Sequence, residues 1–311
     1  MSEEPAEQKR IGGWTPAFRV VLYLVSVLFV LALVQSVVML LAFLVMQISQ
    51  GKTIDFGHDI STLPLPVLAL AYVPSAIFVV LLTLAFVTMV DRRPIATLGF
   101  ARQGTWKAEI AFGLLIGFLM PSLIFLISHL AGWTRISGHA TFSYADLSLK
   151  VIQIILLLAS VALLEETIIR GYVLQTLNWG YGPASALIAS SMLFGAGHFL
   201  NPGAALPGFM GTTAAGLLLG YSYLVTRRLW MPIGIHFAWN LTLGPILGFP
   251  VSGVNVPGII HQEVSGPPLW MGGKFGPEAG LLTLIAVLFG TVAIWMFAQL
   301  PHRPGSLSAE L

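Results

Sequence analysis

Long apolar runs separated by short polar segments dominate the chain. A helix that crosses a bilayer needs about 20 predominantly apolar residues, and eight runs of roughly that kind can be placed between the charged residues. They cover residues 20–48, 63–90, 110–130, 151–177, 184–200, 206–225, 231–249 and 279–300. The predicted fold class is therefore all-α, a polytopic integral membrane protein with about eight transmembrane helices. The predicted organisation is an N-terminal segment (1–19), one transmembrane helical domain (20–300) and a C-terminal tail (301–311).

Composition agrees with this pattern. Hydrophobic residues make up 56% of the 311 residues and charged residues 9%, whereas about a quarter of a soluble domain is charged. Cysteine is absent, which excludes thiol nucleophiles, disulfides and thiolate zinc sites. The net charge of +2 is too small to favour a nucleic-acid partner. The expected surroundings are the lipid bilayer.

The basic residues predict an orientation. Ten Lys and Arg residues fall in the segments on one side of the eight predicted spans and four on the other, and the richer side is expected to be cytoplasmic. Both termini are therefore expected in the cytoplasm, with the protein in the plasma (inner) membrane. The two longer segments on the outer side, 131–150 and 250–278, are interpreted as loops, the second being rich in Gly and Pro.

Ionisable residues inside the predicted spans are few and clustered. Such a group costs roughly 2.5–3.5 kcal/mol at the centre of a bilayer helix, so each is a functional candidate. The fourth span contains LLEETIIR, the fifth ends in FGAGHF and the seventh contains PIGIHFAWN. The candidate residues in these three stretches are Glu165, Glu166, Arg170, His198, His236 and Asn240.

Helical geometry separates the two carboxylates. Residues i and i+4 share a face, whereas neighbours point about 100° apart. Glu166 can therefore pair with Arg170, which favours a structural role, and Glu165 would point elsewhere as a general base. His236 and Asn240 also share a face.

A carboxylate base beside water in a membrane pocket suggests hydrolysis, and the obvious target there is a peptide bond. Other intramembrane protease designs lack their signatures. No H-E-x-x-H zinc motif, no G-x-S-x-G serine elbow and no pair of intramembrane aspartates occurs in the sequence. The expected partner is a peptide or membrane-protein substrate.

The same residues resemble the CPBP intramembrane proteases, a family that includes the type II CAAX prenyl endopeptidases and the bacteriocin-processing (Abi) proteins. The family's E-E-x-x-x-R corresponds to Glu165–Arg170, its F-x-x-x-H to Phe194–His198 and its H-x-x-x-N to His236–Asn240. The resemblance covers roughly residues 150–245, the expected catalytic core. Membership would imply an eight-helix core, which agrees with the count of apolar runs.

The resemblance also implies roles. Glu165 and His198 would activate a water, His236 and Asn240 would stabilise the oxyanion, and Glu166 with Arg170 would fix the fourth helix. Family names often include the word metalloprotease, yet two His, an Asn and a Glu make a weak zinc set. No obligatory metal cofactor is therefore favoured, and a divalent metal such as zinc is the alternative.

Two alternatives and one tension stay open. The chain could act as a catalytically silent membrane scaffold or bacteriocin-immunity-type regulator, or as a transporter, which the lack of an evident inverted repeat disfavours. If the helices were straight and vertical, His198 and His236 would differ in depth by roughly 10–15 Å. Gly195 and Gly197 could let the fifth helix bend or end early, which would reduce that gap.

Overall fold

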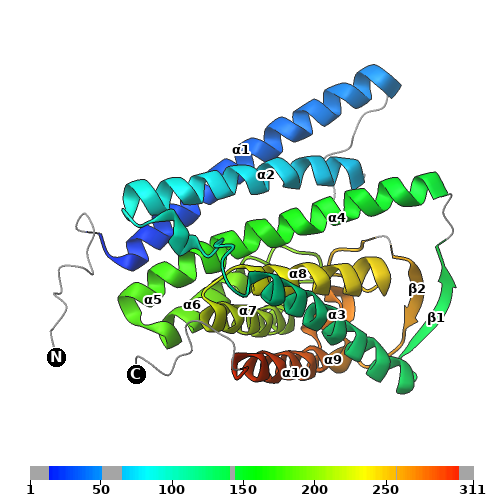
Figure 1. Cartoon of the computed structure of the whole chain (residues 1–311). Coiled ribbons are helices and arrows are strands. Elements are labelled where there is room, and N and C mark those ends of the chain that lie inside the picture. Colours follow the sequence, from blue (N-terminus) through cyan, green and yellow to red (C-terminus); the bar gives the residue numbers. More distant parts are fainter. Residues whose placement is uncertain (1–13, 51–64, 141–143, 257, 301–311) are drawn as a thin grey trace. The chain divides into compact units, whose positions relative to one another are not determined.

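The computed structural model describes residues 14–50, 65–140, 144–256 and 258–300, which fold almost entirely as helices (Figure 1). The predicted all-α fold class is confirmed. The described residues form two compact units. Unit 1 comprises those within Met1–Ile95 and Thr141–Ala186, and unit 2 those within Ala96–Ala140 and Leu187–Leu311.

Unit 1 is built on long apolar helices, in which α2 packs against both α1 and α4 (Figure 1). The fourth helix continues without a break through a π-helical stretch to Tyr181, and it ends at Gly182, whose φ of 82° suits a glycine. The elements are α1 (Pro16–Gln50), α2 (Leu65–Ala85), the π-helix η3 (Phe86–Val90), α4 (Tyr144–Glu166), the π-helix η5 (Thr167–Leu174), α5 (Gln175–Tyr181) and the start of α6 (Pro183–Ala196).

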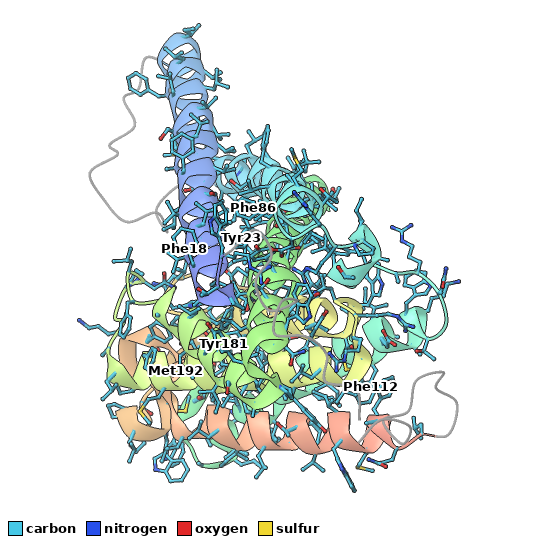
Figure 2. The ribbon with its side chains drawn as sticks, turned by 90° about the vertical axis from the view of Figure 1, so that its left-hand side faces the viewer. Phe18, Tyr23, Phe86, Phe112, Tyr181 and Met192 are labelled. Carbon is cyan, nitrogen blue, oxygen red and sulfur yellow. The ribbon has the colours of Figure 1, made fainter. Side chains whose placement is uncertain are left out.

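A charged cluster lies inside unit 1, near the start of α1 and just after η3. Asp91 is completely buried and accepts hydrogen bonds from Arg19 and Arg93, each at 2.6 Å. The rings of Tyr23 and Phe86 meet edge-on nearby, with centroids 5.2 Å apart (Figure 2). The charges neutralise one another, although Arg19 and Asp91 are 72 residues apart.

Unit 2 is organised around the contact between α3 and α8. A Cβ atom at Gly117 of α3 would overlap the carbonyl oxygen of Ile235 in α8, so the two backbones touch directly. Helix α10 packs on α3, where the ring of Phe297 stacks on that of Phe112 (labelled in Figure 2), with centroids 4.3 Å apart. The elements are α3 (Trp106–Leu130), the remainder of α6, α7 (Leu206–Thr226), α8 (Trp230–Leu241), the π-helix η6 (Thr242–Ile246) and α10 (Leu281–Ala298). The 3-10 helix η4 (Ile95–Leu98) spans the boundary between the units in sequence.

The two segments predicted as outer loops are not simple loops. Strand β1 (Thr134–His139) pairs antiparallel with β2 (Ile260–Val264), with an irregularity between Ile136 and Gly138. The second segment also contains α9 (Pro268–Met271) and the 3-10 helices η7 (Gly273–Phe275) and η8 (Pro277–Ala279). The interpretation of both segments as loops is therefore wrong in part, because pairing between distant segments leaves little local signal.

Five described helices are long and apolar enough to cross a membrane, and many of their large apolar side chains are exposed. They support an integral membrane protein with several spans. The count of eight stays a prediction. Of the other three predicted spans, one corresponds to α7 and two to shorter helices. Helix α6 has 14 residues, about 21 Å at 1.5 Å per residue, which is less than the hydrocarbon thickness. Helix α8 has 12 residues. Residues 1–13 and 301–311 lie outside the described part, so the cytoplasmic orientation of the termini also stays a prediction.

Candidate active site

The acidic pair of the E-E-x-x-x-R motif lies at the end of α4 in unit 1. Glu166 and Arg170 are completely buried, and Nη1 of Arg170 lies 2.7 Å from Oε1 of Glu166. The predicted i,i+4 ion pair is confirmed. The neighbouring residue Glu165 is half-buried, and its charge acts on the phenol of Tyr72 in α2. No sequence motif indicates Tyr72.

Helix α6 ends before His198 in unit 2. Its last residue is Ala196, and His198 lies in the turn formed by residues 197–200. The Nδ1 atom of His198 lies 2.8 Å from the carbonyl oxygen of Phe194. A carbonyl oxygen only accepts hydrogen bonds, so Nδ1 is the donor, and a singly protonated ring carries its lone pair on Nε2. That nitrogen can accept a proton or bind a metal.

Helix α8 presents His236 and Asn240, which are each 7% exposed. Both are buried on a helix whose backbone is fixed against α3 at Gly117. The spacing of four residues places the imidazole and the amide on one face. A buried N–H donor pair of this kind can stabilise a developing negative charge in a site that excludes bulk water.

Phe194 connects the two histidines within unit 2. Its ring centroid lies 4.9 Å from that of His198 and 6.0 Å from that of His236, with an almost perpendicular arrangement in the second pair. The two imidazoles therefore flank one phenyl ring. Helix α6 ends at Ala196 and the chain turns there, at the two glycines, so His198 lies beside the same phenyl ring as His236.

The structure thus brings three of the six predicted residues together in unit 2 and the other three in unit 1. His198, His236 and Asn240 belong to unit 2, whereas Glu165 belongs to unit 1. The prediction that all four share one site stays a prediction.

The donor set also bears on a metal. Among the residues that the structure describes, no group of three or more His, Asp or Glu side chains is placed to hold a metal ion. A zinc site in this chain would use His198 and His236 and would need a carboxylate as its third ligand. The two imidazoles could supply two of the three ligands, and His198 would bind the metal through Nε2.

Two buried polar residues near the site had no signal in the sequence. Trp239 directly precedes Asn240, and its indole Nε1 donates to Oε1 of Glu278 at 3.0 Å. Glu278 lies in η8, inside the segment interpreted as a loop, and is 7% exposed. No local sequence pattern indicates this pair, because the two residues are 39 positions apart.

Comparison with known proteins agrees with the motifs. The family model described as type II CAAX prenyl endopeptidase Rce1-like matches residues 147–242, less than a third of the chain. No curated protein and no solved structure matches the chain. The matched segment contains Glu165, Glu166, Arg170, His198, His236 and Asn240. Residues 147–242 of this chain are thus similar to the type II CAAX prenyl endopeptidases.

Proposed function

We propose that this chain is an intramembrane endopeptidase that hydrolyses a peptide bond near the membrane with a glutamate-activated water. The observation that carries the proposal is the grouping of His198, His236 and Asn240 in unit 2, with Nε2 of His198 left as the acceptor. These residues lie in the segment that matches a peptidase family, which supports peptide hydrolysis over other reactions.

In the proposed mechanism, Glu165 accepts a proton from water, with His198 orienting that water through Nε2. The resulting hydroxide attacks the scissile carbonyl carbon, and the carbonyl oxygen takes up the negative charge. N–H donors of His236 and Asn240 stabilise this oxyanion. The tetrahedral intermediate then collapses as the protonated Glu165 delivers its proton to the leaving amine, which restores the carboxylate. Glu166 and Arg170 hold α4 and η5 in place.

The proposed substrate is a peptide or membrane protein cut near the cytoplasmic leaflet. The matched family is described by its action on CAAX prenyl substrates, so a prenylated C-terminal peptide is the first substrate to test. The proposal places the chain in the plasma (inner) membrane with residues 1–19 and 301–311 in the cytoplasm and residues 20–300 as one transmembrane domain.

The proposal includes no obligatory metal. A zinc ion would have to take Glu165 as a ligand beside the two imidazoles, and that carboxylate would then no longer be free to accept the proton of water. A zinc-dependent reaction is the competing version.

The decisive experiment compares wild type with Glu165→Gln, because glutamine keeps the shape of the side chain and removes the base. New membrane-protein N and C termini are mapped in cells that express either form at equal levels. The control is Glu263→Gln in the exposed strand β2. Fragments that appear with wild type and with this control, but not with Glu165→Gln, support the proposal and identify the substrate. Identical termini in both forms would contradict it and favour a catalytically silent scaffold.

A further inference from the structure

The turn that carries His198 is hydrogen-bonded through Asn201 to the segment that follows η6. The backbone N–H of Asn201 donates to the carbonyl oxygen of His198 at 3.1 Å. The side-chain Nδ2 of Asn201 donates to the carbonyl oxygen of Ser252 at 2.9 Å. Movement of Ser252 would therefore pass directly to the backbone beside His198.

Ser252 is in turn held by Glu278. Its φ of 47° lies in the left-handed region, which non-glycine residues rarely adopt without local support. That support is visible: the backbone N–H and the hydroxyl of Ser252 both donate to Oε2 of Glu278, the hydroxyl at 3.0 Å. Hydrogen bonds to a carboxylate are among the stronger ones in proteins.

The other oxygen of the same carboxylate reaches α8. Oε1 of Glu278 accepts the indole N–H of Trp239 at 3.0 Å, and Trp239 stands beside Asn240 and one turn from His236. The backbone of Glu278 is fixed as well, because a Cβ atom at Gly211 of α7 would overlap its carbonyl oxygen. One buried carboxylate thus connects the His198 turn with the helix of His236 and Asn240.

We propose that Glu278 is a positioning residue for the active site. Its two oxygens hold Ser252 and Trp239 at once, and so fix the His198 turn relative to the donors of α8. The inference rests on the proposed function, and it assigns a role in catalysis to a residue outside the segment matched by the family. A displacement of about 1 Å in such a constellation can lower the rate 100-fold.

The test uses Glu278→Gln, Trp239→Phe and the double variant in the full chain. Glutamine has the size of glutamate, but its amide offers one acceptor oxygen, so either the Trp239 arm or the Ser252 arm is lost. We expect kcat to fall about 10- to 100-fold in each single variant, with KM within about twofold of wild type. The double variant should be no slower than the slower single variant, because both changes break one linkage. Glu263→Gln on exposed β2 is the matched control and should keep wild-type kinetics.

Hydrogen exchange provides a readout that does not require catalysis. In Glu278→Gln, the backbone amides of residues 197–201 and around Ser252 should exchange faster, whereas those of α10 should not change. An unchanged kcat, an unchanged exchange pattern, or single effects that multiply in the double variant would each overturn the proposal. A fall in kcat that matches only the loss of folded protein would overturn it too.

The Glu165→Gln and Glu278→Gln variants together distinguish a failure of this proposal from a failure of the proposed function. If Glu165→Gln cleaves as fast as wild type, the peptidase mechanism fails whatever Glu278 does. Hydrogen exchange then still decides whether Glu278 holds the His198 turn, and unchanged protection would remove that role as well.

Discussion

The Nδ1 atom of His198 donates to the carbonyl oxygen of Phe194, one helical turn earlier, at 2.8 Å. The bond fixes the ring in one tautomer, because the carbonyl cannot donate. We expect nitrogen NMR of histidine-labelled protein at alkaline pH to show a protonated Nδ1 and a bare Nε2 for His198. The signal is assigned by its loss in His198→Gln. A protonated Nε2 would contradict the proposed use of this nitrogen as an acceptor.

Asn240 is expected to act on the transition state more than on substrate binding. Replacement by alanine removes one donor from the proposed oxyanion site, and loss of such a donor typically costs about 10²–10³ in kcat. We therefore expect Asn240→Ala to lower kcat by about that factor with a nearly unchanged KM, measured by steady-state cleavage in lipid vesicles. Gln299→Ala removes an exposed amide at the end of α10 and serves as the control. A rise in KM at constant kcat would instead indicate a role in binding substrate.

The Glu166–Arg170 pair should matter most when only one partner is removed. Arg170→Met leaves the carboxylate of Glu166 buried without its nearest cation, and breaking a buried pair in this way costs about 3–5 kcal/mol. The double variant Glu166→Leu with Arg170→Met should recover most of the lost free energy of unfolding, because no buried charge is left. Unfolding in detergent by denaturant measures both. Equal losses in the single and double variants would show that the pair contributes more than charge neutralisation.

Asp91 is predicted to stabilise the folded state of unit 1. Asp91→Asn removes the negative charge that Arg19 and Arg93 share, and leaves Arg19, with a side chain only 1% exposed, in an apolar setting. We expect a loss of about 3–5 kcal/mol in the free energy of unfolding. Arg92→Gln, at the exposed neighbouring position, should change it by less than about 0.5 kcal/mol. Similar effects of the two substitutions would refute the importance of the cluster.

Removal of metal by chelation distinguishes the metal-free mechanism from the zinc-dependent one. If water is activated by Glu165 without a metal, cleavage should be unaffected by millimolar 1,10-phenanthroline or EDTA after extensive dialysis. Loss of cleavage that returns on addition of stoichiometric zinc would establish the zinc-dependent version. The inactive Glu165→Gln form, tested for zinc binding in parallel, would show whether that carboxylate is a ligand.

Local geometry explains which parts of the site were predictable. The Glu166–Arg170 pair depends only on helical spacing, and it forms at 2.7 Å as expected. The sequence also indicated the early end of α6, because Gly195 and Gly197 lie at the position where the helix ends. Long apolar runs in a chain with few charges indicated membrane helices, and five described helices satisfy that expectation.

Contacts between distant segments were not predictable. The pairing of β1 with β2 and the bond between Trp239 and Glu278 join parts of the chain that carry no shared periodicity. Arg19 and Asp91 are 72 residues apart, and only the packing at the start of α1 and after η3 reveals them as partners. Motif spacing shows which residues share a helix face, whereas which faces meet depends on the whole fold.

The π-helix η5 sets the angle about the helix axis between the side chains that precede it and those that follow it in one long helix. It lies between the two glutamates, Glu165 and Glu166, and the later residues Thr176 and Trp179. Thr176 accepts a hydrogen bond from Arg93, and the ring of Trp179 lies beside Arg19 and Arg93. Deleting one residue from this stretch would turn everything after it by about 100°. The downstream side chains would then face away from the charged cluster while the glutamates kept their direction. The number of residues in the π-helical stretch therefore fixes the direction of the downstream side chains relative to the two glutamates.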